Sequence, residues 1–131
     1  MEKLNIAIAD DNERMVRLLG DIVRSDEELQ VIGTAKDGVE AYELIKTAEP
    51  DVVLLDIVMP KMDGFEVLNV MERKHLIEDI PVIMISSEDS DVYVRRAYEL
   101  GVSDYINRPF DAKIVCQRVY NTIKLLSLIH I

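Results

Sequence analysis

Two stretches decide the fold: residues 4–11, Leu-Asn-Ile-Ala-Ile-Ala-Asp-Asp, and residues 52–56, Val-Val-Leu-Leu-Asp. Each is a short apolar run ending in aspartate, and such runs are typical of buried parallel strands. In an open parallel sheet, the carboxyl ends of the strands face the ligand crevice. If the two strands are neighbours, Asp10, Asp11 and Asp56 converge, and their repulsion requires a cation or protons. We therefore expect a Mg²⁺-assisted phosphoryl site at this edge.

Strand and helix patterns alternate along the chain. Strands are expected at residues 4–9, 29–35, 52–56, 81–85 and 104–106. Helices are expected at residues 12–25, between the Asp37-Gly38 turn and Pro50, after Asp63-Gly64, at 90–101 and at 112–126. Five strands and five helices in strict alternation predict a parallel sheet with helices on both faces.

Local signals support several of these boundaries. Asp63 followed by Glu66 predicts a capping box at the start of the third helix. Gly101 is suited to the left-handed conformation that ends many helices. The single cysteine, Cys116, lies in an expected helix and is interpreted as a packing residue.

Composition narrows the classes of function. The chain has 131 residues, which suits one domain, and its 25 acidic against 15 basic residues give a net charge of -10. That charge repels nucleic-acid backbones and anionic membranes, so we expect neither as a direct partner. A lone cysteine, no signal-peptide pattern and no apolar run near the ~20 residues of a membrane helix favour a cytoplasmic protein.

From about residue 4 to residue 126, the chain resembles the receiver domain of two-component response regulators. The motifs are the Asp10-Asp11 pair, residues 53–60, residues 62–64, Ser86-Ser87 and residues 104–110, in the order and spacing of that family. The resemblance implies an α/β fold: a flavodoxin-like, doubly wound (βα)5 three-layer sandwich with strand order 2-1-3-4-5. Residues 1–126 would form the receiver domain. Residues 127–131 would be an apolar tail: a truncated linker helix, an oligomer seam or an expression artefact.

The resemblance also implies the roles of the aspartates. Asp56 corresponds to the phospho-acceptor, whose carboxylate attacks a phosphohistidine of a partner kinase. Asp11 and Asp56 correspond to direct ligands of Mg²⁺ (or Mn²⁺), and Asp10 to a ligand acting through water. The backbone carbonyl of Val58 is the remaining ligand expected from the protein.

Two further residues correspond to the family's switch. Ser86 corresponds to the hydroxyl residue that hydrogen-bonds a phosphoryl oxygen. Tyr105 corresponds to the aromatic residue that turns inward when the hydroxyl moves toward the phosphate. The surface expected to change is the face formed by helix 4, strand 5 and helix 5, through a shift between two existing packings.

One position departs from the family pattern. The family carries lysine immediately before the proline of the last motif, and this chain has Arg108. Arginine keeps a permanent charge and can bind two oxygens at once, but its planar fork is bulkier than an ammonium group. The family's phosphoryl contact by lysine, and the coupling of that contact to switching, are therefore not assigned to Arg108 from the sequence. The family also predicts a cis Arg108-Pro109 peptide.

Three functions remain open from the sequence. The first is a phospho-acceptor signalling module rather than an enzyme. Its partners would be a sensor histidine kinase or phosphotransfer protein, and a second copy docked through the helix 4-strand 5-helix 5 face. The second is a Mg²⁺-dependent phosphohydrolase with an aspartyl nucleophile. The third is a degenerate receiver that acts only by binding, a reading motivated by Arg108.

Overall fold

The computed structural model describes residues 3–87 and 90–129, with side chains through residue 124. Its five strands form one parallel sheet in the order β2-β1-β3-β4-β5, as expected. The strands are β1 (Leu4–Ala9), β2 (Leu29–Ala35), β3 (Val52–Leu55), β4 (Val82–Ser86) and β5 (Asp104–Asn107).

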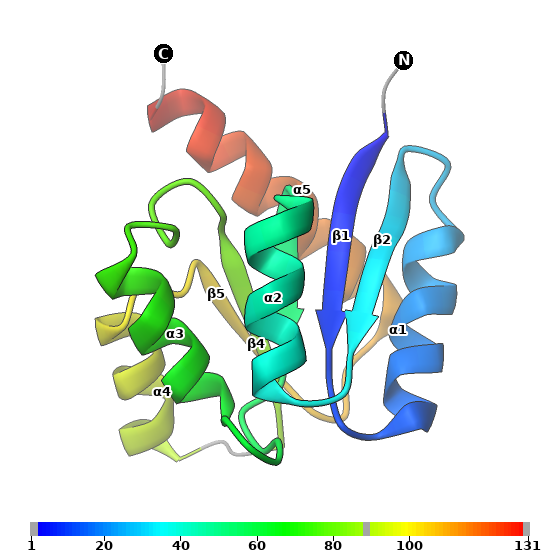
Figure 1. Cartoon of the computed structure of the whole chain (residues 1–131). Coiled ribbons are helices and arrows are strands. Elements are labelled where there is room, and N and C mark those ends of the chain that lie inside the picture. The colour runs from blue at the N-terminus through cyan, green and yellow to red at the C-terminus, as the bar shows by residue number, and fades with distance from the viewer. Residues whose placement is uncertain (1–2, 88–89, 130–131) are drawn as a thin grey trace.

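Five helices cover the two faces of this sheet, and Figure 1 shows the resulting three layers. The helices are α1 (Glu13–Arg24), α2 (Gly38–Ala48), α3 (Gly64–Arg73), α4 (Asp91–Glu99) and α5 (Ala112–Ile129). Helices α1 and α5 pack on one face, and α2, α3 and α4 pack on the other. The expected doubly wound α/β sandwich is thus confirmed.

The core has two halves because successive side chains of a strand point to opposite faces of the sheet. In β1, Ile6 and Ile8 pack with the apolar residues of α1 and α5, whereas Ala7 and Ala9 pack on the side of α2 and α3. All four β1 residues are nearly inaccessible to solvent. A strand buried on both faces must be apolar throughout, which explains the uninterrupted runs in the sequence.

The local signals have their expected outcomes. Asp63 and Glu66 form a reciprocal capping box at the start of α3. Helix α4 ends at Glu99, and Gly101 follows with a φ of 101°, a conformation that residues with a side chain rarely adopt. Cys116 is half-buried in α5, and burial raises the pKa of its thiol, as suits a packing residue. The Arg108-Pro109 peptide is cis, as predicted.

Element boundaries differ slightly from the sequence predictions. The third strand ends at Leu55 rather than Asp56, the fourth runs from Val82 to Ser86, and the fifth ends at Asn107. The shifts are one residue each. They arise because strand ends depend on hydrogen-bonded neighbours that a local pattern does not contain.

The end of α5 requires a larger correction, since it continues to Ile129 instead of stopping at Leu126. The apolar residues 127–129 therefore extend the helix backbone. Their side chains, together with residues 130 and 131, lie outside the described part, so the domain boundary at 126 and the nature of the tail stay predictions. Within residues 3–87 and 90–129, the helices do not reach the length and hydropathy that crossing a membrane requires.

Candidate functional site

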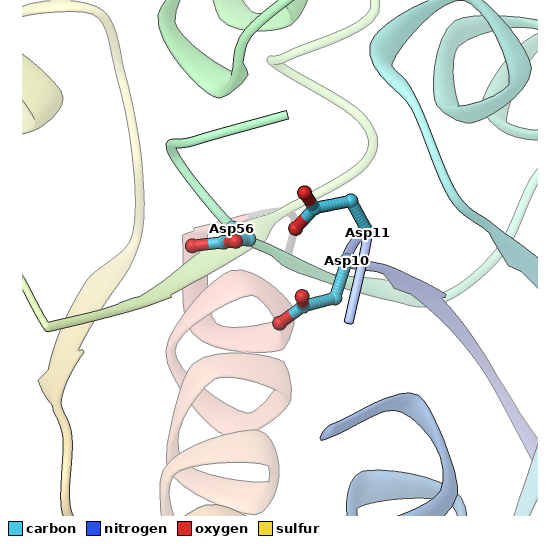
Figure 2. A group of neighbouring side chains, drawn as sticks. All are labelled: Asp10, Asp11 and Asp56. Atoms are coloured by element: carbon cyan, nitrogen blue, oxygen red, sulfur yellow. The ribbon is translucent and has the colours of Figure 1, made fainter. Parts of the chain in front are cut away.

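Three carboxylates meet at the carboxyl edge of the sheet. Asp10 and Asp11 follow β1, Asp56 follows β3, and these strands are paired, with Ala9 opposite Leu55. One carboxylate oxygen from each aspartate lies within 4.8 Å of the others. Figure 2 shows the three side chains side by side at the ends of the two strands, with the carboxylates of Asp10 and Asp11 directed to the side on which Asp56 lies. The expected convergence is therefore present in the structure.

Adjacent residues Asp10 and Asp11 have different surroundings. Asp10 is 1% exposed, whereas the side chain of Asp11 is open to solvent. The Asp10 Oδ1 atom accepts a hydrogen bond from the backbone N–H of Asn12 at 2.9 Å. The backbone N–H of Asp10 donates to the carbonyl of Ala35 at 3.0 Å. Asp10 is thus held from two sides, while Asp11 is available to an incoming cation.

Asp56 is a buried carboxylate whose ionised form is only partly compensated. The residue is 7% exposed, its N–H donates to the carbonyl of Ala9 at 2.9 Å, and its Oδ1 accepts from the Ile57 N–H at 2.9 Å. Burial, and next the charge of Asp10, raise the pKa of Asp56 from 3.8 to about 6, against the opposing effect of Arg108. An added positive charge near Asp56 would therefore stabilise the ionised form of its carboxylate.

Arg108 supplies the positive charge inside the cluster. Its Nη2 atom donates to Asp10 Oδ2 and to the carbonyl of Ile85, the latter at 3.2 Å. The same nitrogen lies 3.6 Å from Asp56 Oδ1. The buried Nε atom has no hydrogen-bond partner among the described residues. Arg108 therefore contacts two of the three carboxylates, and its Nε donor is unused among the described residues.

The donor set suits Mg²⁺. Hard cations of this kind take oxygen ligands, and Mg²⁺ uses one or two carboxylates and keeps several waters. Here two carboxylates are buried and one is exposed, and the pKa of Asp56 is raised first by burial and next by the charge of Asp10, against the opposing effect of Arg108. The aspartates could hold a divalent cation without rearrangement of the strands that carry them.

The remaining predicted residues lie at the end of β4, in β5 and in the connection after β3. Ser86 ends β4, is 1% exposed, and accepts the backbone N–H of Arg108 on its carbonyl at 3.0 Å. Tyr105 in β5 is 8% exposed and belongs to the core half beneath α2, α3 and α4. Val58 lies in the connection after Asp56, with its side chain 62% exposed. Their predicted roles stay predictions.

Sequence reasoning did not find the contacts that orient these side chains. They come from backbone groups of Asn12, Ala35, Ile57 and Ile85. Every residue carries such groups, so no residue type marks them in the sequence. Only strand pairing and loop conformation decide which of them reach a carboxylate or a guanidinium.

Comparison with known proteins identifies the class. Residues 6–120 match the family model of the response regulator receiver domain. Since this match spans most of the chain, the protein belongs to the response regulator receiver domain family of two-component systems. The receiver domain is a signalling module, and its acidic pocket is a Mg²⁺ site in the family, which agrees with the three aspartates.

Particular relatives refine this placement. The chain is 41% identical over 110 residues to a protein-glutamate methylesterase/protein-glutamine glutaminase of Pyrococcus horikoshii, covering 82% of this chain and 29% of that protein. The chain thus spans under a third of that relative, and the similarity carries no methylesterase activity to it.

Solved structures agree with the fold. The response regulator domain of Thermotoga maritima CheB has a TM-score of 0.86 at 29% identity, covering 94% of this chain and 98% of that one. A CheX-CheY-BeF3-Mg complex from Borrelia burgdorferi has a TM-score of 0.83 at 37% identity, covering 92% and 89%.

Proposed function

We propose that this receiver accepts a phosphoryl group on Asp56 from the phosphohistidine of a partner kinase or phosphotransfer protein. The observation that carries the proposal is the buried Asp56, with its raised pKa, beside two further carboxylates and Arg108. Family membership supports it, as does the similarity to a CheY solved in a complex named for BeF3 and Mg.

The reaction requires one bond exchange. A carboxylate oxygen of Asp56 attacks phosphorus, the P–N bond to imidazole breaks in line, and imidazole leaves with the bonding electrons. Within the described residues, the hydrogen bond and ion pair of the Asp56 carboxylate fall on Oδ1. We assign Oδ2 as the attacking atom because a lone pair engaged by a donor is a weaker nucleophile.

Asp10, Asp11 and Asp56, with the backbone carbonyl of Val58, would hold the divalent cation. When bound, Mg²⁺ offsets the charge that the carboxylates and the transferred phosphoryl group bring together. Mn²⁺, with its similar preference for oxygen ligands, would serve the same residues. The strand pairing between β1 and β3 orients these residues before any cation arrives.

Arg108 and Ser86 would bind the phosphoryl oxygens. The Nε of Arg108, which has no hydrogen-bond partner in the described part of the chain, is a donor already present at the site, and Ser86 lies at the end of the neighbouring strand β4. Tyr105 would transmit the change to the face formed by α4, β5 and α5. Its register partner in β4 is Met84, two residues before Ser86, so the switch residues share one strand pair.

The partner surfaces follow from this role. A histidine kinase or phosphotransfer protein must reach Asp56 from the open carboxyl edge of the sheet. A second copy would dock on the α4-β5-α5 face, where Tyr98 of α4 is 47% exposed and its hydroxyl donates to Asp104 of β5. The net charge of -10 disfavours direct contact with nucleic acid or anionic membranes. We place the protein in the cytoplasm, where such kinases present their phosphohistidine.

Labelling with acetyl phosphate tests the proposal. With Mg²⁺ the wild-type chain should acquire one hydroxylamine-labile phosphoryl group, detected by intact-mass spectrometry, and chelation should abolish it. Asp56→Asn should remove the label. Asp63→Asn is the matched control, since Asp63 caps α3 in the same connection and asparagine caps equally well. A label that survives Asp56→Asn, or is lost in Asp63→Asn, would refute the assignment of Asp56.

A second candidate is favoured by Arg108 itself. Its ion pairs with Asp10 and Asp56 already neutralise part of the cluster, as a binding module that is never phosphorylated would require. Absence of any label on wild-type protein that still binds Mg²⁺ would favour this candidate. No contact among the described residues favours the phosphohydrolase, which steady turnover of a phosphomonoester would reveal.

A further inference from the structure

One segment contacts both halves of the site although none of its residues is a predicted ligand. This segment, residues 35–38, runs from the last residue of β2 to the first residue of α2. The Ala35 carbonyl accepts the N–H of Asp10 at 3.0 Å, and the Gly38 N–H donates to the carbonyl of Pro60 at 3.5 Å. Pro60 belongs to the connection between β3 and α3, residues 56–63, here called the acceptor loop because it begins with Asp56. The segment thus joins the half of the site after β1 to the half after β3.

We propose that Asp37 and Gly38 are positioning residues that set the acceptor loop, and with it Asp56 and Val58, against Asp10. The proposal rests on the proposed function. It assigns these two residues no contact with the phosphoryl group or the cation; they act through residues 60–62.

Gly38 is required by close packing. A Cβ atom at this position would lie 1.8 Å from the Met62 carbonyl oxygen and 2.4 Å from the Met62 Cβ. These atoms belong to the backbone or sit directly on it, so they cannot rotate away. At Gly33 the nearest atom is instead the Cδ1 of Leu44, at 2.6 Å, the far end of a flexible side chain. Of these two glycines, Gly38 is therefore the one at which a side chain would force the acceptor loop itself to move.

Asp37 adds an ionic tie to the same loop. The residue is 2% exposed, and its Oδ1 caps α2 by accepting the Glu40 N–H at 2.8 Å. Its Oδ2 lies 3.6 Å from the Nζ of Lys61. Lys61 has a φ of 67°, a left-handed backbone conformation uncommon for a residue with a side chain. One buried carboxylate therefore connects the start of α2 to the tightest turn of the acceptor loop.

The far end of the acceptor loop is also anchored, so a displacement at residues 60–62 is passed toward Asp56. The Gly64 N–H donates to the Ile57 carbonyl at 2.7 Å, and a Cβ at Gly64 would lie 2.4 Å from the Asp56 carbonyl oxygen. The Met62 N–H donates to the Pro60 carbonyl at 2.7 Å, which makes the intervening turn rigid. Val58 lies between Ile57 and Pro60, the two residues whose carbonyls accept these bonds.

The test compares Gly38→Ala with the matched control Gly33→Ala in metal-free protein by amide NMR. We expect Gly38→Ala to shift the amide signals of residues 56–62, and Gly33→Ala to leave them in place. In a Mg²⁺ titration followed by the same signals, Gly38→Ala should weaken affinity by about tenfold, as loss of a supporting residue commonly does. Unshifted signals at residues 56–58, or unchanged Mg²⁺ affinity in folded Gly38→Ala, would overturn the proposal.

A second variant decides the matter if Gly38→Ala does not fold. Asp37→Asn keeps a capping side chain of the same shape but loses the charge that faces Lys61. It should shift the signals of residues 60–62 and weaken Mg²⁺ binding by a smaller factor, whereas unchanged signals and affinity would overturn the proposal. The NMR comparison needs neither metal nor phosphate, so a wild-type chain that takes no label would refute the proposed function separately.

Discussion

Two arginine–aspartate contacts flank β5 and differ in their charge balance. At the first residue of β5, both carboxylate oxygens of Asp104 accept hydrogen bonds from Arg118 Nη1, at 2.7 and 2.8 Å. Past the end of the strand, Arg108 contacts Asp10 and lies 3.6 Å from Asp56. The first contact is one cation with one anion. The second is one cation for a group of three carboxylates.

The surroundings sharpen this difference. Asp104 Oδ1 also accepts the Tyr105 N–H at 2.8 Å and the Tyr98 hydroxyl at 3.4 Å, so its charge is amply satisfied. Asp56, by contrast, has its pKa raised to about 6. A pair of one cation and one anion holds elements together, whereas a buried cluster with more anions than cations is stabilised by an added cation. The Asp104–Arg118 pair thus has the charge balance of a structural contact, and the Arg108 cluster has the imbalance that the proposed function requires.

The largest expected effect is that of Arg108→Ala in the absence of Mg²⁺. Arg108 is the only cation in contact with Asp10 among the described residues, so its removal leaves buried carboxylates unpaired, which costs about 3 kcal/mol in the free energy of unfolding at neutral pH. Urea denaturation in EDTA measures it. Arg108→Lys, which keeps the charge, should lose much less. Equal loss in both variants would mean that the shape of arginine, rather than its charge, is what stabilises the cluster.

The next effect has the opposite sign. Because the pKa of Asp56 is raised from 3.8 to about 6, the folded state binds its proton more tightly than the unfolded state. The stability of the metal-free wild type should therefore fall as the pH rises from about 4 through 6. The asparagine of Asp56→Asn does not ionise, so this variant should be more stable than wild type by about 2 kcal/mol at pH 7.5.

The control for this prediction is the same pair of proteins at pH 4, where their difference in unfolding free energy should nearly vanish. A difference independent of pH would contradict the buried, under-neutralised state of Asp56. Denaturation curves should be measured in EDTA, since a bound cation would stabilise the ionised carboxylate.

Addition of Mg²⁺ should produce a moderate stabilisation confined to the unbalanced cluster. At a concentration ten times the dissociation constant, binding to the folded state alone contributes about 1.4 kcal/mol. Thermal unfolding with and without MgCl₂, at ionic strength matched with NaCl, measures it. Asp11→Asn, which removes the exposed carboxylate, should reduce the shift. Equal stabilisation by NaCl would show general screening in place of a site.

The smallest effect is expected at the balanced pair. The side chain of Arg118 is 39% exposed, so solvent screens its contact with Asp104, and Arg118→Ala should cost about 1 kcal/mol or less. Mg²⁺ affinity and acetyl phosphate labelling should match the wild type within error. A large change in either would show that the Asp104–Arg118 pair is coupled to the site and is more than a structural contact.

Much of this architecture was accessible from local sequence. The capping box of Asp63 and Glu66 depends on residues three apart, and it forms as predicted. The apolar runs before Asp10 and Asp56 place both residues at strand ends. Other features escaped because their partners are distant in the chain. Asp37 was interpreted as part of a turn, although it is buried and its partner Lys61 lies on another loop.

The elements, their order and the aspartates at the strand ends follow from local sequence, because periodicity and capping act over a few residues. The burial of Asp10 beside an exposed Asp11 depends instead on tertiary packing. Tertiary packing also decides that Arg108, 98 residues further on, reaches Asp10, and that Gly38 packs against Met62. The physical reason is that these contacts depend on which strands become neighbours, and strand pairing brings together groups that no local pattern connects.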